Sequence, residues 1–334
     1  MIDKYTPPFT ITAKITQLLT EIGEKIGRLS LLSDSAADLR LRRISRIKTI
    51  QGSLAIEGNT LTIEQITAIL DNKLVIAPPK EIQEAKSAIA AYDMLETLDP
   101  RSEKDLLRTH SIMMGGLVDS AGRYRSGNVG VISGERVIHM APTAAIVPEL
   151  IGNLFDWLAR TDMHPLIAGA VFHYEFEFIH PFIDGNGRMG RLWNTLILYR
   201  WNSIFAYMPV ENLIHSAQQE YYNAIQMSTK QSDSAPFIEY ILGVIKDSAL
   251  FTPQVTPQVT PQVTPQVTPQ VSQLLAVLYG EMTRDELQSA LQLKDPKSFR
   301  ERYLAPALKA GVIEMTIPDK PNSRLQRYRR TNSD

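Results

Sequence analysis

The chain has 334 residues with 35 Lys or Arg and 36 Asp or Glu, so its formal net charge is −1. This balance gives no general affinity for nucleic acid, and the absence of cysteine excludes disulfides, thiolate catalysis and cysteine-bound metals. No apolar run is long enough to span a membrane, and the first residues lack the apolar core of a secretion signal. We therefore expect a cytoplasmic protein without a membrane partner, long enough for two domains.

The first hundred residues are expected to form helices, because apolar residues recur there at spacings of three and four. In the segment 36–57, Ser53 and Glu57 share one helical face, and Gly58 supplies the stop. Taken alone, this segment is an ordinary helix end with a solvated glutamate. The predicted helices before the middle of the chain cover residues 12–29, 36–56, 63–70, 79–95 and 102–114.

Residues 122–139 predict a β-hairpin whose turn is Ser133-Gly134-Glu135. Both a plain surface hairpin and a docking element agree with this pattern. The candidate docking residues along its two strands are Val129, Gly130, Val131, Ile132, Val137, Ile138 and His139.

The segment from His180 to Arg191 reads His-Pro-Phe-Ile-Asp-Gly-Asn-Gly-Arg-Met-Gly-Arg and joins two predicted helices. Gly185 and Gly187 allow successive N–H groups to converge, and the second helix adds its positive N-terminal end. The expected ligand is therefore a phosphate chain. Arg188 lies three residues before Arg191 on one helical face, so both guanidinium groups could reach that chain.

Two further groups in this segment suit phosphate chemistry. Asp184 offers a hard oxygen ligand to a Mg²⁺ ion that bridges phosphates. His180 carries the only side chain in the loop that titrates near neutrality, which makes it the natural general base. Each residue alone is common at turns and surfaces, but their co-occurrence in one loop and one helical turn indicates a nucleotide site.

A repeat marks the end of the helical region. Thr-Pro-Gln-Val occurs five times between Thr252 and Val271. A proline at every fourth residue is incompatible with the interior of a helix or a sheet, so the repeat predicts a linker. We expect an N-terminal helical region over 1–100, a core over 101–250, a linker over 251–271 and a small domain over 272–334.

The last segment predicts helices over 272–279, after a capping box at Thr283, and over 296–310, then strands over 311–317 and 325–330. Three helices and a two-stranded wing resemble a winged-helix domain. Its basic residues make DNA a candidate partner, whereas its acidic residues and the use of this fold in protein docking favour a protein partner equally. The basic residues are Lys294, Lys297, Arg300, Arg302, Lys320, Arg324, Arg327, Arg329 and Arg330.

The segment His180 to Arg191 matches, at every defining position, the signature of the Fic family, His-x-Phe-x-Asp/Glu-Gly-Asn-Gly-Arg-x-x-Arg. The resemblance implies a mostly α fold: a Fic-type helical domain with a β-hairpin flap, here followed by the small α+β winged-helix domain. It implies a protein adenylyltransferase, which uses ATP and Mg²⁺ to attach AMP to hydroxyl side chains of target proteins. Doc, a kinase-like relative, departs from the motif in the glycine region, so transfer of AMP is favoured over transfer of a phosphoryl group.

The resemblance also assigns a role to each matching position. His180 would take the proton from the attacking hydroxyl, and Asp184 would hold the metal. A tyrosine near the adenine ring is common in the family, and Tyr222 is a candidate, although a core position is equally consistent. The residues that would wrap or contact the phosphates are Gly185, Asn186, Gly187, Arg188 and Arg191.

Two segments outside the motif resemble regulatory and docking parts of the family. Ser53-Leu54-Ala55-Ile56-Glu57-Gly58 resembles its inhibitory Ser/Thr-x-x-x-Glu-Gly/Asn motif, which implies that Glu57 pairs with Arg191 in place of the γ-phosphate. The hairpin at 122–139 resembles the flap that binds a target segment by main-chain pairing. An autoinhibited enzyme is thus one hypothesis. The alternative hypothesis is a DNA-binding regulator whose Fic unit modifies itself or removes AMP. A homodimer is compatible with both hypotheses.

Overall fold

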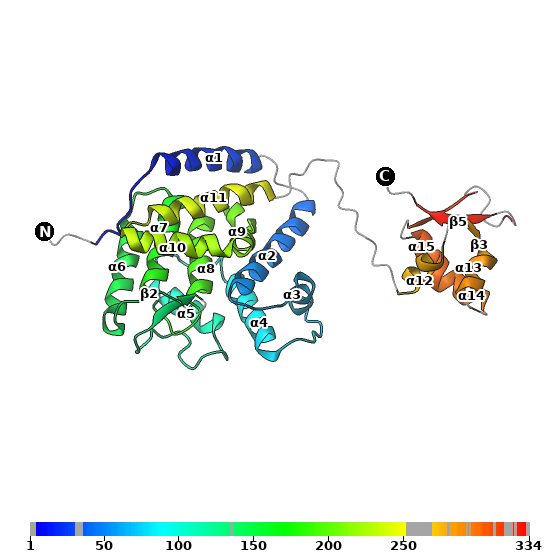
Figure 1. Ribbon diagram of the computed structural model, residues 1–334, viewed down its shortest axis with the longest axis horizontal. Coiled ribbons are helices and arrows are strands. Elements are labelled where there is room, and N and C mark those ends of the chain that lie inside the picture. The colour runs from blue at the N-terminus through cyan, green and yellow to red at the C-terminus, as the bar shows by residue number, and fades with distance from the viewer. Residues whose placement is uncertain are drawn as a thin grey trace. The chain divides into compact units, whose positions relative to one another are not determined.

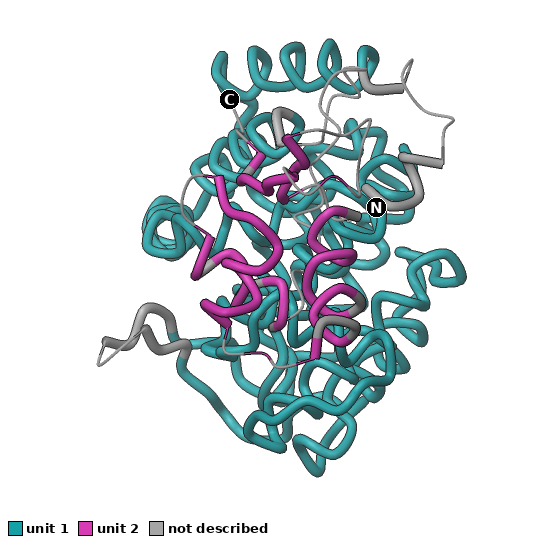
Figure 2. Tube along the Cα trace, turned by 90° about the vertical axis from the view of Figure 1, so that its right-hand side faces the viewer, with its two compact units in different colours: residues 1–254 teal, residues 255–334 magenta. Residues whose placement is uncertain are grey.

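The computed structural model describes residues 5–30, 36–133, 136–251, 269–278, 281–291, 293, 295–309, 312–316, 323 and 326–331. The chain divides into two compact units, Met1–Gln254 and Val255–Asp334 (Figure 2). The buried apolar side chains form two separate clusters, one between Ile15 and Ala249 and the other between Val271 and Tyr328. Each unit is therefore built around a core of its own.

The first unit is mostly helical, as the sequence predicted (Figure 1). The capping box at Thr62 starts α3, and Schellman-type hydrogen bonds close α2, since Asn59 N–H donates to the carbonyl of Leu54. Its helices before the hairpin are α1 (Ala13–Ser30), α2 (Ala36–Ile56), α3 (Ile63–Leu70), α4 (Pro79–Asp93) and α5 (Glu103–Met113). After it come α6 (Val147–Arg160), α7 (Pro165–Ile179), α8 (Asn186–Trp201), α9 (Val210–Ser216), α10 (Gln218–Gln231) and α11 (Ala235–Phe251), with short 3-10 turns η1 (Ala144–Ile146) and η2 (Ser203–Tyr207).

Helices α7 and α8 form the centre of this unit and pack along each other. Both are buried around most of their circumference, and Phe172, Phe176, Trp193 and Leu196 are fully buried. The loop that joins them, residues 180–185, is held between two rigid elements. Helix α2 packs against α9 and η2, so its C-terminal end is fixed near the start of α8. The core thereby positions both sequence motifs.

A two-stranded antiparallel hairpin, β1 (Gly130–Ser133) and β2 (Arg136–Met140), lies between α5 and α6. Gly130 pairs with Met140 and Val131 with His139, and an irregularity between Val131 and Ile132 then shifts the register so that Ile132 faces Val137. The predicted turn residues Gly134 and Glu135 lie outside the described residues. The backbone of the predicted hairpin is thus present, with a bulge that the sequence did not indicate.

The second unit combines short helices with a three-stranded antiparallel sheet of order β3-β5-β4. Helix α12 begins at Pro269, inside the last repeat, because proline is tolerated in the first turn of a helix. Strand β3 was not predicted, since two residues between helices carry no periodic signal. The elements are α12 (Pro269–Val277), β3 (Met282–Thr283), α13 (Arg284–Ala290), α14 (Pro296–Phe299), the π-helical η3 (Arg300–Leu304), α15 (Ala305–Lys309), β4 (Ile313–Met315) and β5 (Arg327–Arg330).

Among the residues described, no helix is both long and apolar enough to cross a membrane.

Candidate active site

The loop between α7 and α8 is shaped by two left-handed residues. His180 ends α7 with φ 51° and ψ 62°, and Pro181 prevents the helix from continuing. Gly185 precedes α8 with φ 85°, and a Cβ on it would lie 2.6 Å from the sulfur of Met114. Glycine is therefore required at this position for conformation and for space. The non-glycine His180 in this region marks it as a residue that the surrounding structure holds in place.

The imidazole of His180 has a defined orientation. Its Nδ1 lies 3.3 Å from the carbonyl oxygen of Glu177 and 3.9 Å from a carboxylate oxygen of the same residue. A carbonyl oxygen only accepts hydrogen bonds, so Nδ1 carries the proton in the neutral ring. Nε2 is then the acceptor, which is the state that a general base needs.

Asn186 holds the loop closed. Its Oδ1 accepts from the N–H of Phe182 at 2.9 Å, and its Nδ2 donates to the carbonyl of Phe182 at 2.9 Å. The residue is 2% exposed. The sequence placed Asn186 among the residues that wrap phosphate, but its side chain is fully engaged within the loop. A phosphate contact from this residue would have to come from its backbone N–H.

Asp184 presents a carboxylate that suits a magnesium ion. Its Oδ1 accepts from the N–H of Gly185 at 2.6 Å and from Nη2 of Arg188 at 3.2 Å. The side chain is 49% exposed, so it remains accessible at the mouth of the loop. One carboxylate beside a phosphate site is a common way to hold Mg²⁺, whose other ligands are water and the phosphates. The described residues contain no cluster of three or more His, Cys, Asp or Glu side chains that could hold a metal without such a substrate.

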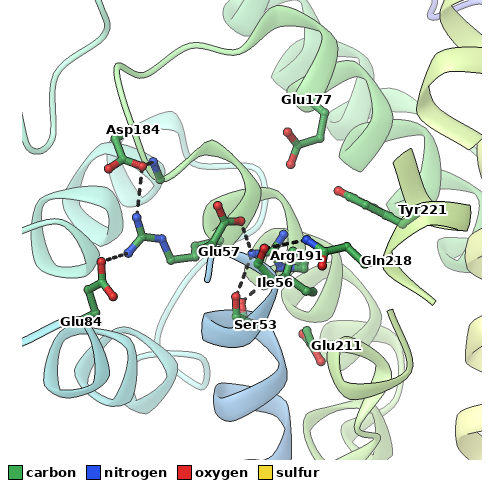
Figure 3. A network of polar contacts seen from close by, with 12 residues as sticks. Ser53, Ile56, Glu57, Glu84, Glu177, Asp184, Arg191, Glu211, Gln218 and Tyr221 are labelled. Carbon is green, nitrogen blue, oxygen red and sulfur yellow. Dashed lines mark hydrogen bonds and ion pairs between the residues drawn. The ribbon is translucent and has the colours of Figure 1, made fainter. Parts of the chain in front are cut away.

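The two arginines of the motif turn to different partners, and Figure 3 shows Arg191 beside Ser53 and Glu57. Arg188 lies against Asp184 and, at 3.9 Å, against the carboxylate of Glu84 on α4. Arg191 points to the end of α2: its Nη2 donates to Oε1 of Glu57 at 2.7 Å and to the carbonyl of Ser53 at 3.1 Å, and its Nε donates to the hydroxyl of Ser53 at 3.2 Å. The structure thus brings together the two sequence motifs that were predicted to meet.

The ion pair between Glu57 and Arg191 includes a buried guanidinium, so the charge of Glu57 has a strong effect on it. Arg191 is 2% exposed, and although burial by itself lowers its pKa, the adjacent Glu57 carboxylate raises the pKa above its ordinary value. A Cβ on Gly187 would lie 2.5 Å from Oε1 of Glu57 and 2.9 Å from the guanidinium of Arg191. The glutamate therefore occupies the space over the first turn of α8, at the positive helix end.

Gln218 and Gly58 fix the segment that carries Glu57 at the end of α2. Nε2 of Gln218, at the start of α10, donates to the carbonyl of Ile56 at 2.8 Å. Gly58 takes a φ of 86°, which turns the chain away directly after Glu57, the residue that follows α2. Tyr222 is half-buried, and its hydroxyl accepts from the same Gln218 at 3.2 Å. The tyrosine therefore lies beside the segment that carries Glu57, whereas its neighbour Tyr221 is buried in the core.

Two residues that the sequence did not single out hold the loop between α7 and α8. Arg125 is 3% exposed and its guanidinium donates to four carbonyls: those of His180 at 2.8 Å, Gly127 at 2.9 Å, Ile179 at 3.3 Å, and Pro142. Because residues 127 and 142 flank the hairpin, this one side chain ties the base of the hairpin to His180. A buried arginine between distant segments has no local sequence signal.

His110 is the second such residue. The N–H of Gly122 donates to its Nδ1 at 2.8 Å, so its Nε2 carries the proton and donates to the carbonyl of Asp184 at 3.0 Å. Burial lowers the pKa of His110 to about 4, which keeps the ring neutral. Its ring also stacks on Phe182 at a centroid distance of 3.6 Å. His110, which the sequence left without a role, thus fixes both ends of the segment that carries Asp184.

Comparisons with known proteins agree with this geometry. A family model described as "Fic/DOC family" matches residues 97–198, and one described as "Filamentation induced by cAMP protein Fic-like, C-terminal domain" matches residues 269–331. A crystal structure of a Fic family protein from Desulfovibrio desulfuricans G20 is 48% identical, with a TM-score of 0.73, and the match covers 99% of both chains. The chain belongs to the Fic family.

Curated relatives of this Fic protein carry a functional name. "Protein adenylyltransferase Fic" of Nematostella vectensis is 31% identical over 245 residues, which are 68% of this chain and 55% of the relative. "Protein adenylyltransferase fic-1" of Caenorhabditis elegans is 31% identical over 252 residues, which are 69% and 47%. The structure of C. elegans Fic-1 superposes with a TM-score of 0.61 at 27% identity, over 72% of each chain. The Fic chain described here spans about half the length of these curated relatives.

Proposed function

We propose that this Fic protein transfers AMP from ATP to hydroxyl side chains of target proteins, and that Glu57 inhibits the transfer. The observation that supports it best is the meeting of an oriented base, His180, with the N-terminal end of α8 and Arg191. The names of the relatives favour this chemistry over other uses of a phosphate site.

The proposed step requires little from the protein beyond positioning and charge. The target hydroxyl gives its proton to Nε2 of His180 while its oxygen attacks the α-phosphorus, and pyrophosphate leaves. Backbone N–H groups from Gly185 to Gly187 and the guanidinium of Arg188 would bind the phosphates. Asp184 would hold Mg²⁺, which offsets the charge of the leaving pyrophosphate when it is bound.

The inhibitory part of the proposal follows from the position of Glu57. Its carboxylate takes the guanidinium of Arg191, the group that would bind the γ-phosphate. ATP and Glu57 are both anionic at this point, so they compete for one cation. The extra hydrogen bonds from Arg191 to Ser53 hold the arginine in the inhibited arrangement.

The targets are proposed to be proteins, this chain among them, that bind beside the hairpin. Because the sheet has two strands, β1 and β2 each have one edge without a strand partner among the described residues, and such an edge can pair with an extended segment through its main chain. The side chains of Val131, Ile132, Val137, Ile138 and His139 lie outside the described ones, so the docking role rests on the backbone from Val129 to Met140. A second copy of the chain is one such target.

For the second unit we favour protein docking over DNA binding. Of the predicted basic residues, Lys294, Lys320 and Arg324 lie outside the described residues. Arg329 pairs with Glu314 at 2.7 Å and with Glu281 at 3.3 Å. These carboxylates reduce the positive charge that β5 offers to phosphate. A gel-shift assay with genomic DNA fragments at physiological salt tests this choice, because a sequence-dependent shift would favour the regulator instead.

The test of the main proposal uses two labels. We expect the Glu57→Gly variant, incubated with cell lysate, to label proteins from ATP that carries ³²P at the α position but not at the γ position. Labelling from the γ position would instead show phosphoryl transfer, and no labelling from either would reject the proposed activity.

A further inference from the structure

Glu177 lies one turn before His180 on α7, and its carboxylate has no role in the scheme above. The residue is 8% exposed. Its Oε2 lies 3.9 Å from Nδ1 of His180, and its Oε1 lacks a hydrogen-bond partner among the residues described. A buried carboxylate with an unused acceptor is costly, because the charge has left water without full compensation. The burial of the Glu177 carboxylate therefore needs a structural or functional explanation.

Helix α8 leaves space for this carboxylate. A Cβ on Gly190 would lie 2.9 Å from Oε1 of Glu177 and 2.9 Å from Cδ2 of His173. A side chain at position 190 would thus require the glutamate or His173 to move. Figure 3 shows the carboxylate of Glu177 directed into the interior, toward Tyr221. The glycine at position 190 therefore leaves room for the Glu177 carboxylate next to His180.

We propose that Glu177 is a positioning residue for His180, and that its carboxylate stabilises the imidazolium that forms during AMP transfer. The proposal rests on the proposed function. In that step the hydroxyl proton moves to Nε2 of His180, the hydroxyl oxygen bonds to the α-phosphorus, and the bond from this phosphorus to the pyrophosphate oxygen breaks. Pyrophosphate leaves with the electron pair, and the ring holds one positive charge.

The carboxylate acts through charge and not through the choice of tautomer. The backbone carbonyl of Glu177 already accepts from Nδ1, so the neutral ring is oriented without the side chain. When the ring becomes cationic, the Glu177 carboxylate at 3.9 Å stabilises the positive charge better than water would, because the carboxylate is buried. We therefore expect removal of the Glu177 carboxylate to reduce the rate less than in sites where one carboxylate both sets the tautomer of the histidine and stabilises its charge.

Several charged or titratable groups face the Glu177 carboxylate. Burial raises its pKa to about 7, and Arg191 opposes that rise. The groups around it are His173 and His180 on α7 and at its end, Arg191 on α8, Tyr221 on α10 and Glu57 on α2.

Glu175 is a matched comparison on the same helix. It is also buried, at 5% exposed, but its Oε2 accepts a hydrogen bond from the hydroxyl of Tyr5 at 2.8 Å. Burial raises its pKa to about 6. Glu175 thus has a side-chain partner in Tyr5, whereas Oε2 of Glu177 lies 3.9 Å from Nδ1 of His180 and its Oε1 faces His173 and α8. Glu175→Gln therefore controls for the loss of a buried charge from α7.

The experiment uses the full chain with Glu57→Gly as the active parent. We expect added Glu177→Gln to lower kcat for labelling about 10- to 100-fold, with the KM for ATP unchanged. The acid limb of the pH–rate profile should move to lower pH, because removal of the anion lowers the pKa of His180. Glu175→Gln should change neither kcat nor the acid limb of the pH–rate profile. Glu177→Asp, which keeps the anion, should retain more activity than Glu177→Gln and also serves if the latter does not fold.

An NMR titration separates this proposal from the function on which it rests. The imidazole signal of His180, assigned by its loss in His180→Ala, should titrate at lower pH in Glu177→Gln than in the parent. If the parent labels no protein, AMP transfer is rejected, but the titration still decides the role of Glu177. An unchanged imidazole pKa in Glu177→Gln overturns the proposal, as does an equal loss of rate in the Gln and Asp variants with an unchanged pH profile.

Discussion

Nη2 of Arg191 donates a hydrogen bond of 2.7 Å to Oε1 of Glu57, and these residues are separated by 134 positions in the chain. The arginine is fully enclosed, whereas the side chain of the glutamate is 34% exposed. The buried cation is therefore fixed and the partly exposed anion is the partner that can move. In the proposed function an incoming phosphate would replace the carboxylate on the same guanidinium, so the proposed inhibition would be a competition for Arg191 and not a block of His180.

We expect His180→Ala, in the Glu57→Gly background, to abolish labelling while the affinity for ATP stays within a few-fold. The imidazole acts on the attacking hydroxyl, and removal of a general base typically costs about 10² to 10⁴ in rate. Initial rates with α-labelled ATP, together with calorimetric ATP titration, measure the two effects. Labelling at the rate of the parent would exclude His180 as the base.

Asp184→Ala should remove the dependence of labelling on Mg²⁺ along with most of the rate, since the half-exposed carboxylate is the group placed to hold the ion. Titration of Mg²⁺ at fixed ATP gives the measurement. The matched control is Asp162→Ala, which removes an exposed carboxylate from the α6 to α7 connection. An unchanged Mg²⁺ dependence in Asp184→Ala would remove this residue from the metal role.

Arg125→Lys should slow labelling about tenfold or more and destabilise the chain by about 1–3 kcal/mol, because an ammonium cannot reach the four carbonyls that the guanidinium bonds. The carbonyl of His180 is one of them, so its left-handed backbone loses support. Arg123→Lys, two residues earlier and exposed, is the control. Thermal melts and initial rates give both quantities. If the Arg125→Lys and Arg123→Lys variants label at the same rate, the hydrogen bonds that link the hairpin to His180 have no catalytic role.

Deletion of residues 272–334 should leave self-labelling in the Glu57→Gly background within a few-fold of the full chain. Each unit has a separate apolar core, so the first unit keeps its own core when the second is removed. The measurement is the initial labelling rate of the soluble shortened chain. A collapse of activity would show that the second unit contributes to the chemistry.

The sequence predicted those parts of the site that are local. His180, Asp184 and Gly185 fall within one loop whose flanking helices have clear periodicity, and the spacing of Ser53 and Glu57 marks one helical face. The helices and the hairpin were predicted for the same reason. The fold then supplied the contact between the two motifs.

Residues that act across the fold could not be predicted from their neighbours. Arg125 bonds to carbonyls 17 and 55 residues away, and His110 bonds to a carbonyl 74 residues away. Asn186 was placed on phosphate because its motif position suggested it, but its amide closes the loop on Phe182. Pro269 was assigned to the linker because of the repeat, although a proline can start a helix.

The central claim is that Glu57 and the γ-phosphate compete for Arg191, and the initial rate of labelling in three variants tests it most directly. Glu57→Gly removes the competing anion, and a hundredfold rise would correspond to about 2.7 kcal/mol of relieved inhibition. Arg191→Ala breaks the same ion pair but also removes the proposed ligand of the phosphate. We therefore predict that Arg191→Ala stays at or below the wild-type rate, and that the double variant stays low as well. Activation of Arg191→Ala to the level of Glu57→Gly would contradict the account, because the pair would then be only a structural clamp.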